Sequence, residues 1–396
     1  MMDIIRKATK IEKKIERKLE REVSMRTKLW QRYNEWQHHL PLAFFIGGFV
    51  WDHLTLTRID QWLDQAILTI HLLIATTAVI LMQVVTRIRG RRKPPEEGDP
   101  PPPRSFIGDR AHWYPNLFQF SLGALFSGFF VFFSRSGTLV SSWPFLLLLI
   151  AFLVGNEIFK KRYEKFIFQI SVYYFVLFLF LILFVPVIIG SMSGWIFLAS
   201  GIASLVVMAG FMRVLWRIAP ERLHKTQTLL WGSILSIFAI MNVLYVTNII
   251  PPIPLSLKDI GIYHQVQKIE DGYLVQYERP AWYEFWRRSD KVFHRTNGTS
   301  VYAYAAVFAP TKLSTQIFHD WQYYDESSEK WISAGRISYN VVGGRDGGFR
   351  GYTLKMNVFP GTWRVDVETA RGQLLGREKF EVVAAQGDPD LVSAVR

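Results

Sequence analysis

The sequence predicts a membrane-embedded bundle of about seven α-helices followed by an all-β sandwich domain. Three observations predict this fold. Half of the 396 residues are apolar, and between residues 38 and 250 they form runs of about 20, long enough to cross the hydrocarbon of a bilayer. Basic residues are concentrated in alternate connections between these runs. After residue 250, short stretches of alternating apolar and polar residues are separated by turn residues.

The distribution of charge predicts the orientation of the chain. Of the 46 Lys and Arg residues, 26 lie in four tracts on one side of the predicted spans, 18 lie after residue 250, and only Arg58 and Arg135 lie in connections on the other side. Positive charge is retained in the cytoplasm. We therefore expect a bacterial inner-membrane protein with a cytoplasmic N-terminus and a periplasmic C-terminal domain.

The same division accounts for the net charge of +13. The four cytoplasmic tracts carry 13 acidic residues and so a net charge of +13, whereas the other two regions carry −1 and +1. The basic excess is therefore explained by orientation and by anionic lipid headgroups in the bilayer, and no nucleic-acid partner is predicted. Cysteine is absent, which excludes disulfides, thiolate metal sites and a cysteine nucleophile.

Residues 1–37 predict a basic amphipathic helix in the cytoplasm, because apolar residues recur at steps of three and four. Two interpretations remain open, a helix on the membrane surface and a solvated helix or short coiled coil. The stretch 88–110 is rich in proline and charge and predicts an extended cytoplasmic linker. Without a cleavage site, the first span is expected to be an uncleaved signal anchor. Within the membrane region 38–250, the predicted spans are 40–57, 64–86, 114–134, 138–157, 166–187, 191–213 and 226–248.

Residues 251–396 predict the exported domain. Eight short strands without helices favour a β-sandwich, plausibly immunoglobulin-like. Trp363, Val365 and Val367 alternate with charged residues, as expected for a strand with one buried face. The predicted strands are 260–268, 272–278, 299–308, 314–323, 331–341, 350–358, 362–369 and 374–383.

Part of this domain resembles a known family. The chain contains His319-Asp-Trp321, then Phe349-Arg-Gly-Tyr-Thr-Leu-Lys355, then Gly361-Thr-Trp-Arg-Val365, a turn glycine at Gly372, and Phe380-Glu-Val382. Over residues 319–383 this pattern resembles the bacterial domain of unknown function catalogued as family number 2914. The resemblance implies several membrane spans ahead of the domain. It implies no activity, and the Trp and Gly residues of the pattern are expected to determine the fold.

Five residues are candidates for ligand binding. Arg350 and Lys355 lie beside the glycine-rich segment 343–351 and could capture a carboxylate, phosphate or sugar. Trp321 belongs to the family pattern. Trp282 and Trp286 lie in an aromatic-basic segment, for which sugar stacking, contact with the membrane interface and ordinary packing in the core all remain open.

A second group of polar residues is predicted around the first two spans. Asp52, His53, Asp60, Asp64 and His71 combine carboxylate and imidazole groups, a combination suited to a divalent metal or a proton relay. The alternative is a polar loop in which Asp60 caps a helix. No motif predicts a metal site, a catalytic residue or a cofactor.

These observations favour a non-enzymatic membrane protein whose periplasmic sandwich binds an envelope glycan, a lipid or a partner protein. One alternative is a transporter or lipid-handling protein that uses the Asp/His cluster. A second alternative is a membrane enzyme acting on envelope lipid or glycan.

Overall fold

The computed structural model of the chain describes residues 40–56, 58–90, 106–136, 139–158, 165–270, 272–284, 287–296, 298–311 and 313–396. The chain divides into two compact units, Met1–Thr55 and Leu56–Arg396. The predicted helix at 1–37 and most of the linker at 88–110 lie outside the described residues.

The described part of the first unit is the helix α2 (Leu40–Thr55), which corresponds to the first predicted span. It has 16 residues, so it is about 24 Å long, which is shorter than the hydrocarbon core of a typical bilayer. Near its end, the Thr55 hydroxyl donates a hydrogen bond of 2.8 Å to the carbonyl of Trp51.

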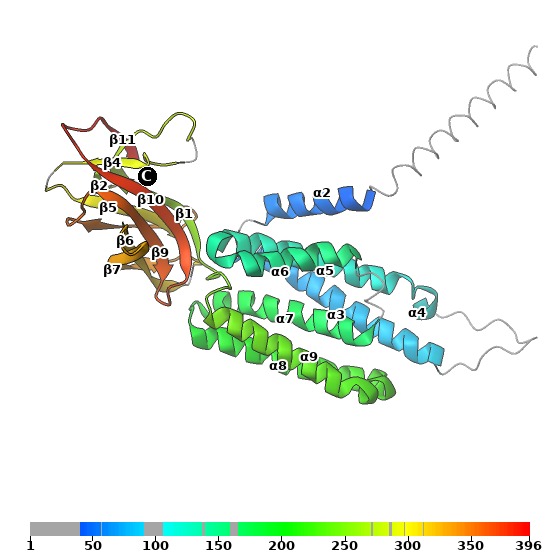
Figure 1. Cartoon of the computed structure of the whole chain (residues 1–396). Helices are drawn as coiled ribbons and strands as arrows, with labels where there is room; N and C mark the ends of the chain where they lie inside the picture. The colour runs from blue at the N-terminus through cyan, green and yellow to red at the C-terminus, as the bar shows by residue number, and fades with distance from the viewer. Residues whose placement is uncertain are drawn as a thin grey trace, which may run out of the picture. The chain divides into compact units, whose positions relative to one another are not determined.

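The second unit contains the other six predicted spans, each of which is helical (Figure 1). Five of these helices are long and apolar enough to cross a membrane, and α6 contains a shorter apolar stretch, Ser141–Asn156. The prediction of a region of long apolar helices is therefore confirmed. The helices are α3 (Trp62–Gly90), α5 (Trp113–Ser136), α6 (Leu139–Ile158), α7 (Phe166–Ile189), α8 (Gly194–Ile218) and α9 (Pro220–Val246), together with the single turn α4 (Phe106–Asp109).

Buried amide side chains join these helices in pairs. Gln83 on α3 donates a 3.0 Å hydrogen bond to Gln169 on α7. Gln119 on α5 and Asn156 on α6 each donate to the other's backbone carbonyl at 2.9 Å. Gly123 allows this approach, because a Cβ there would lie 3.1 Å from the Asn156 amide nitrogen. These polar groups therefore satisfy one another inside the bundle, as expected for residues that hold membrane helices together.

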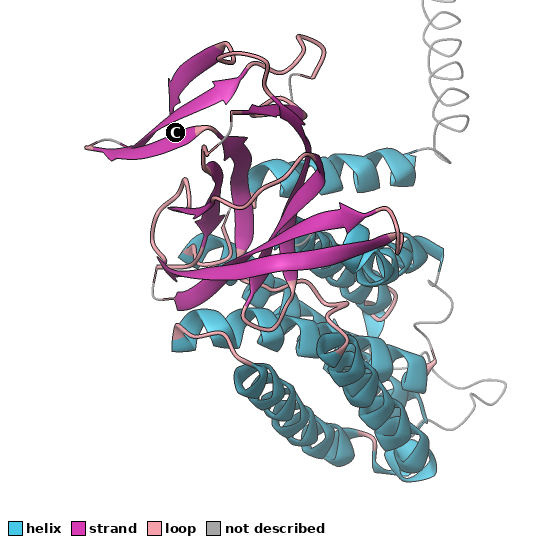
Figure 2. Cartoon of the chain, turned by 60° about the vertical axis from the view of Figure 1, so that its left-hand side comes forward, coloured by secondary structure: helices cyan, strands magenta, loops and turns pink. Residues whose placement is uncertain are grey.

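The chain after residue 255, which we call the β-domain, contains eleven strands within its described residues (Figure 2). They form three sheets, with strand orders β1-β5-β8, β4-β10-β9-β6-β7 and β11-β3-β2. Except for β4, which runs parallel to β10, all paired strands are antiparallel. The strands are β1 (Ser256–Tyr263), β2 (Gln265–Ile269), β3 (Gly272–Glu278), β4 (Val292–Arg295), β5 (Val301–Phe308), β6 (Ser314–Asp325), β7 (Lys330–Val342), β8 (Phe349–Lys355), β9 (Gly361–Thr369), β10 (Leu374–Ala384) and β11 (Leu391–Val395).

The sheets stack in three layers rather than in the two layers of the predicted sandwich. The sheet β1-β5-β8 lies in the middle. Its Ile262 and Ala303 pack against Trp363 of the five-stranded sheet, whereas Tyr263 and Tyr304 pack on the opposite side against residues of β2 and β3. The middle sheet is therefore covered on both faces, which explains why nearly every residue of β5 is buried.

The prediction of a single strand at 260–268 was wrong. The segment breaks at His264, so that β1 belongs to the middle sheet and β2 to the outer one. The prediction also ended at residue 383 and missed β11, which pairs with β3. Together β2, β3 and β11 form the additional layer.

Candidate functional site: a polar cleft in the β-domain

The family-pattern residues His319, Trp321 and Thr353 form one buried hydrogen-bond network. The Trp321 indole N–H donates to the Thr353 hydroxyl at 3.0 Å, and that oxygen lies 2.9 Å from His319 Nδ1. On the other side of the ring, His319 Nε2 faces the Tyr339 hydroxyl at 3.2 Å. Burial lowers the pKa of His319 to about 3, so the ring is neutral.

This network joins sequence motifs that are far apart in the chain. His319 and Trp321 lie on β6, Thr353 on β8 and Tyr339 on β7. Gly351, two residues before Thr353, leaves room for the ring of Tyr339, which a Cβ at that position would overlap. Trp321 is fully buried, so in this conformation no surface ligand reaches it.

The structure does not bring Arg350 and Lys355 together. They are five positions apart on β8, so their side chains point to opposite faces of the strand. The Lys355 ammonium donates a 2.8 Å hydrogen bond to the carbonyl of Ala334 on β7. It thereby links the edge of the middle sheet to the edge of the five-stranded sheet.

Two of the polar residues predicted around the first spans lie where the helices meet the β-domain. The Asp60 carboxylate accepts hydrogen bonds from Arg58 at 2.7 and 3.0 Å, and from the Thr311 amide and hydroxyl at 3.2 Å. Burial would raise the pKa of Asp60, but these hydrogen bonds outweigh it and lower the pKa. Asp64 accepts a 3.1 Å hydrogen bond from the Arg58 amide.

The other three residues of that group are placed differently. Asp52 and His53 lie on α2 in the first unit. His71 lies between two and three turns into α3, with its ring centroid 5.6 Å from that of Phe120. Among the described residues, no group of three or more His, Asp or Glu side chains is arranged to hold a metal ion.

A second contact attaches the β-domain to α9. Arg371, in the β9–β10 turn, places its guanidinium 4.0 Å from the ring centroid of Tyr245, and the Asn248 side chain donates to the carbonyl of Arg371 at 3.3 Å. Tyr245 in turn stacks on Phe197 with 3.7 Å between ring centroids. Together with the Asp60 contact, this fixes the β-domain to the helices at two separate points.

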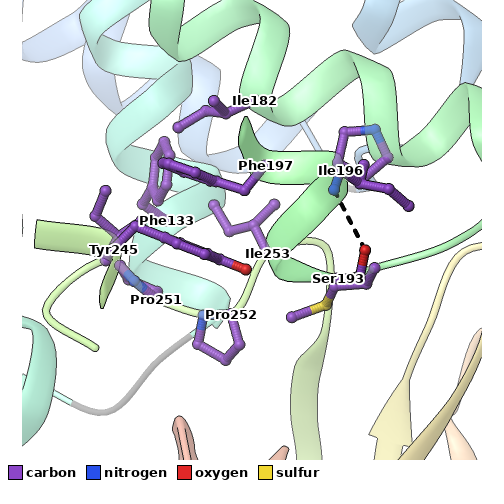
Figure 3. A pocket seen from close by; sticks show the side chains of 12 residues that line it. Phe133, Ile182, Ser193, Ile196, Phe197, Tyr245, Pro251, Pro252 and Ile253 are labelled. Carbon is purple, nitrogen blue, oxygen red and sulfur yellow. Dashed lines mark hydrogen bonds between the residues drawn. The ribbon is translucent and has the colours of Figure 1, made fainter. Parts of the chain in front are cut away.

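An apolar pocket lies beside this second contact, and the side chains of Phe133, Ile182 and Phe197 converge on it (Figure 3). Its volume is about 30 Å³. That is room for one or two water-sized groups, far below the few hundred Å³ of an ordinary ligand site. We interpret it as imperfect packing where the chain leaves the helices at Pro251 and Pro252.

The β-domain contains a larger, open cleft of about 450 Å³, a volume typical of small-ligand sites. One wall is formed by residues on either side of the β3–β4 loop, and the other by the β10–β11 connection. The lining residues are Glu278, Arg279, Asp290, His294, Ala385, Gln386, Gly387, Asp388, Pro389 and Asp390.

Glu278 is held between two histidines at the base of this cleft. One carboxylate oxygen lies 2.8 Å from His264 Nε2 and accepts a 2.7 Å hydrogen bond from the His294 amide, while the other oxygen lies 2.5 Å from His294 Nδ1. Burial would raise the pKa of Glu278, but the hydrogen bonds from the two histidines outweigh it and lower the pKa. The His264 ring also stacks on Phe293, with 4.0 Å between centroids. The arrangement is therefore rigid before any ligand arrives.

The β3–β4 loop carries the aromatic segment predicted from the sequence. Trp282 is 90% exposed and Tyr283 is 58% exposed, whereas Trp286 lies outside the described residues. Arg287 anchors the loop through a 2.5 Å ion pair with Glu378 on β10. Burial raises the pKa of Glu378 to about 6, although the charge of Arg287 acts against this rise.

Sequence reasoning missed the cleft. His264, Glu278, His294 and Asp388 lie in four different segments, and no spacing between them resembles a motif. The one available signal was the conspicuous aromatic segment, which lies on the loop between the lining residues Arg279 and Asp290.

Comparison with known proteins confirms the family resemblance. Residues 314–382 match the family model described as a protein of unknown function, DUF2914, and this segment spans strands β6 to β10. No curated protein matches the chain.

Two solved structures show weak similarity. A β-glucosidase from Listeria innocua in complex with gluconolactone is 11% identical over 32% of this chain and 16% of its own, with a TM-score of 0.18. An alkylpurine DNA glycosylase, AlkC, from Pseudomonas fluorescens bound to DNA containing an abasic site analog is 13% identical over 69% of this chain and 68% of its own, with a TM-score of 0.16. At these TM-scores neither similarity bears on fold or function.

Proposed function

We propose that this chain, whose residues 314–382 match a family of unknown function, is a non-enzymatic protein of the bacterial inner membrane that binds an envelope component. In this proposal seven helices anchor it, the N-terminus is cytoplasmic, and the β-domain lies in the periplasm. The observation that carries the proposal is the open polar cleft, which has the volume of a ligand site and a rigid base at Glu278.

The contacts between the helices and the β-domain support this orientation. Arg58 and Arg135, the two basic residues of the sparsely charged connections, lie at the end of the helices next to the β-domain. Arg58 forms an ion pair with Asp346 of the β-domain, and the Ser256 hydroxyl donates to the Arg135 carbonyl at 2.6 Å. At the other helix ends, Arg87 donates to the carbonyl of Arg217 at 3.0 Å. Charge asymmetry along the bundle is the usual marker of the cytoplasmic side.

The polar residues of the helices favour an anchor over a transporter. Gln83, Gln119 and Gln169 bond to neighbouring helices, and Asp60 bonds to Arg58 and Thr311. Side chains engaged in this way stabilise a fixed bundle. A transporter, a lipid-handling protein and a membrane enzyme remain the competing functions.

Removing charge from the cleft is expected to abolish retention on envelope material. We would bind the full-length protein in nanodiscs to insoluble envelope material and compare it with the double variant Asp388→Asn, Asp390→Asn. The variant should lose at least about tenfold in affinity, since these exposed side chains contribute to recognition rather than to the core. The control is Glu326→Gln on the β6–β7 turn, which removes an exposed carboxylate elsewhere. Equal retention of all three proteins would contradict the proposal.

A further inference from the structure

The charge of the cleft restricts the kind of ligand it accepts. Glu278, Asp290, Asp388 and Asp390 contribute four carboxylates to the lining, Arg279 contributes one guanidinium and His294 one imidazole. Both oxygens of Glu278 are engaged by His264 and His294, so Asp290, Asp388 and Asp390 are the carboxylates that a ligand would meet. A concave site with such an excess of one charge attracts ligands of the opposite sign and repels ligands of the same sign. The cleft therefore disfavours phosphate- and carboxylate-rich polymers and favours groups that carry positive charge or donate hydrogen bonds.

The adjoining loop adds an aromatic surface. The rings of Trp282 and Tyr283 are nearly perpendicular, with centroids 5.9 Å apart, and both are exposed. The loop starts at Arg279 and returns at Asp290, whose amide donates to the carbonyl of Glu278 at 3.1 Å. The aromatic rings are thus carried on the loop that connects two lining residues of the cleft, Arg279 and Asp290. Exposed Trp and Tyr faces bind the apolar face of a sugar ring and attract cations.

Two ion pairs hold this loop in place. Arg287 pairs with Glu378 at 2.5 Å, and Arg288 pairs with Asp259 on β1 at 3.2 Å. Because the loop is fastened to two different strands near its end, less ordering of the chain is required when a ligand binds. Such preorganisation increases affinity.

We infer that the cleft binds an amino sugar, a saccharide that presents a free ammonium group to the carboxylates while a ring face stacks on Trp282. Its hydroxyl groups donate to the remaining carboxylate oxygens and accept from Arg279. The inference rests on the proposed function and adds the class of ligand. A neutral saccharide lacks the ionic contact, and an anionic saccharide is repelled.

The test uses the full-length protein in nanodiscs and three defined probes, measured by isothermal titration calorimetry. The probes are a glucosamine oligomer, the same oligomer fully N-acetylated, and a lysine-rich peptide of equal charge. We expect the glucosamine oligomer to bind at least about tenfold more tightly than its acetylated form, and this preference to shrink as salt rises. Trp282→Ala should weaken binding about three- to tenfold. The control Met356→Ala truncates an exposed apolar side chain on the β8–β9 turn and should leave the affinity for the glucosamine oligomer unchanged.

The remaining outcomes overturn the inference. Equal binding of the two oligomers would remove the role of the ammonium group, and binding of the lysine peptide alone would identify a cationic peptide as the ligand class. Binding of no probe would exclude an amino sugar. If the variant with Asp388→Asn and Asp390→Asn still lost retention on envelope material in that case, the proposed binding function would stand and only the ligand class would fall.

Discussion

Replacing Thr353 by valine is expected to destabilise the β-domain by about 2–4 kcal/mol. Valine keeps the shape of the side chain but removes the hydroxyl that accepts from Trp321 and meets His319 Nδ1. Both of those groups are buried, and each costs about 1–3 kcal/mol when it is left without a partner. Pulse proteolysis of the full-length protein in urea, with the C-terminal fragment detected, gives the change in unfolding midpoint.

The matched control is Thr315→Val, a substitution of the same chemistry at a half-buried position on β6. It should change the free energy of unfolding by less than about 0.5 kcal/mol. If the two variants were equally stable, the buried network would not be what holds the family-pattern residues together.

Acidification is expected to destabilise the β-domain through His319. Its pKa in the folded protein is about 3, below the ordinary histidine value of 6.5, so the unfolded chain binds the proton more readily. The stability that neutral His319 confers is complete above pH 6.5 and decreases as pH falls toward 3. At about 1.4 kcal/mol per pKa unit, the loss amounts to at most roughly 5 kcal/mol.

Glu378 acts in the opposite direction over part of this range. Its pKa is raised from 4.5 to about 6, so its contribution is complete below pH 4.5 and is lost as pH rises through 6. Because the pKa of Glu378 is shifted less than that of His319, Glu378 should offset only part of the stability that His319 loses on acidification. Thermal unfolding of the full chain, followed by near-ultraviolet circular dichroism from pH 7 to 4, should show a falling midpoint. His319→Gln should flatten the curve, and a curve that stayed steep in this variant would assign the pH dependence to other groups.

The helices could be predicted because their signal is local. Each predicted span is an apolar run, and each is helical in the structure. Boundaries were less predictable. The last helix begins at Pro220, six residues before the predicted span, because proline is well suited to the first turn of a helix and the polar residues after it continue the helix beyond the apolar run.

The strands were predictable as segments, but their grouping into sheets was not. Alternation identifies a buried face, and β9 with Trp363 and Val365 was recognised in this way. Nothing in the alternation of residues 260–268 indicates that the chain leaves one sheet at His264 and joins another. The position of the β1-β5-β8 sheet as a middle layer could not be predicted from the sequence either, because it depends on which sheets cover the two faces of β5.

The functional residues depended on contacts between distant segments. Asp60 was predicted from its neighbours in sequence, whereas its partner Thr311 lies 251 residues away. Arg350 and Lys355 are close in sequence, but the two-residue period of a strand separates them. Glu278 and its two histidines become a unit only when β3, β4 and the β1–β2 connection meet.

The most direct test of the central claim is to locate the bound ligand on the full-length protein. Hydrogen–deuterium exchange in nanodiscs, with and without soluble envelope fragments, maps the amides that a ligand protects. We expect protection at the lining residues Glu278, Arg279, Asp290 and His294 and at residues 385–390, and unchanged exchange in β6, β7 and β9. Protection confined to the helices, or none at any fragment concentration, would contradict binding at the cleft.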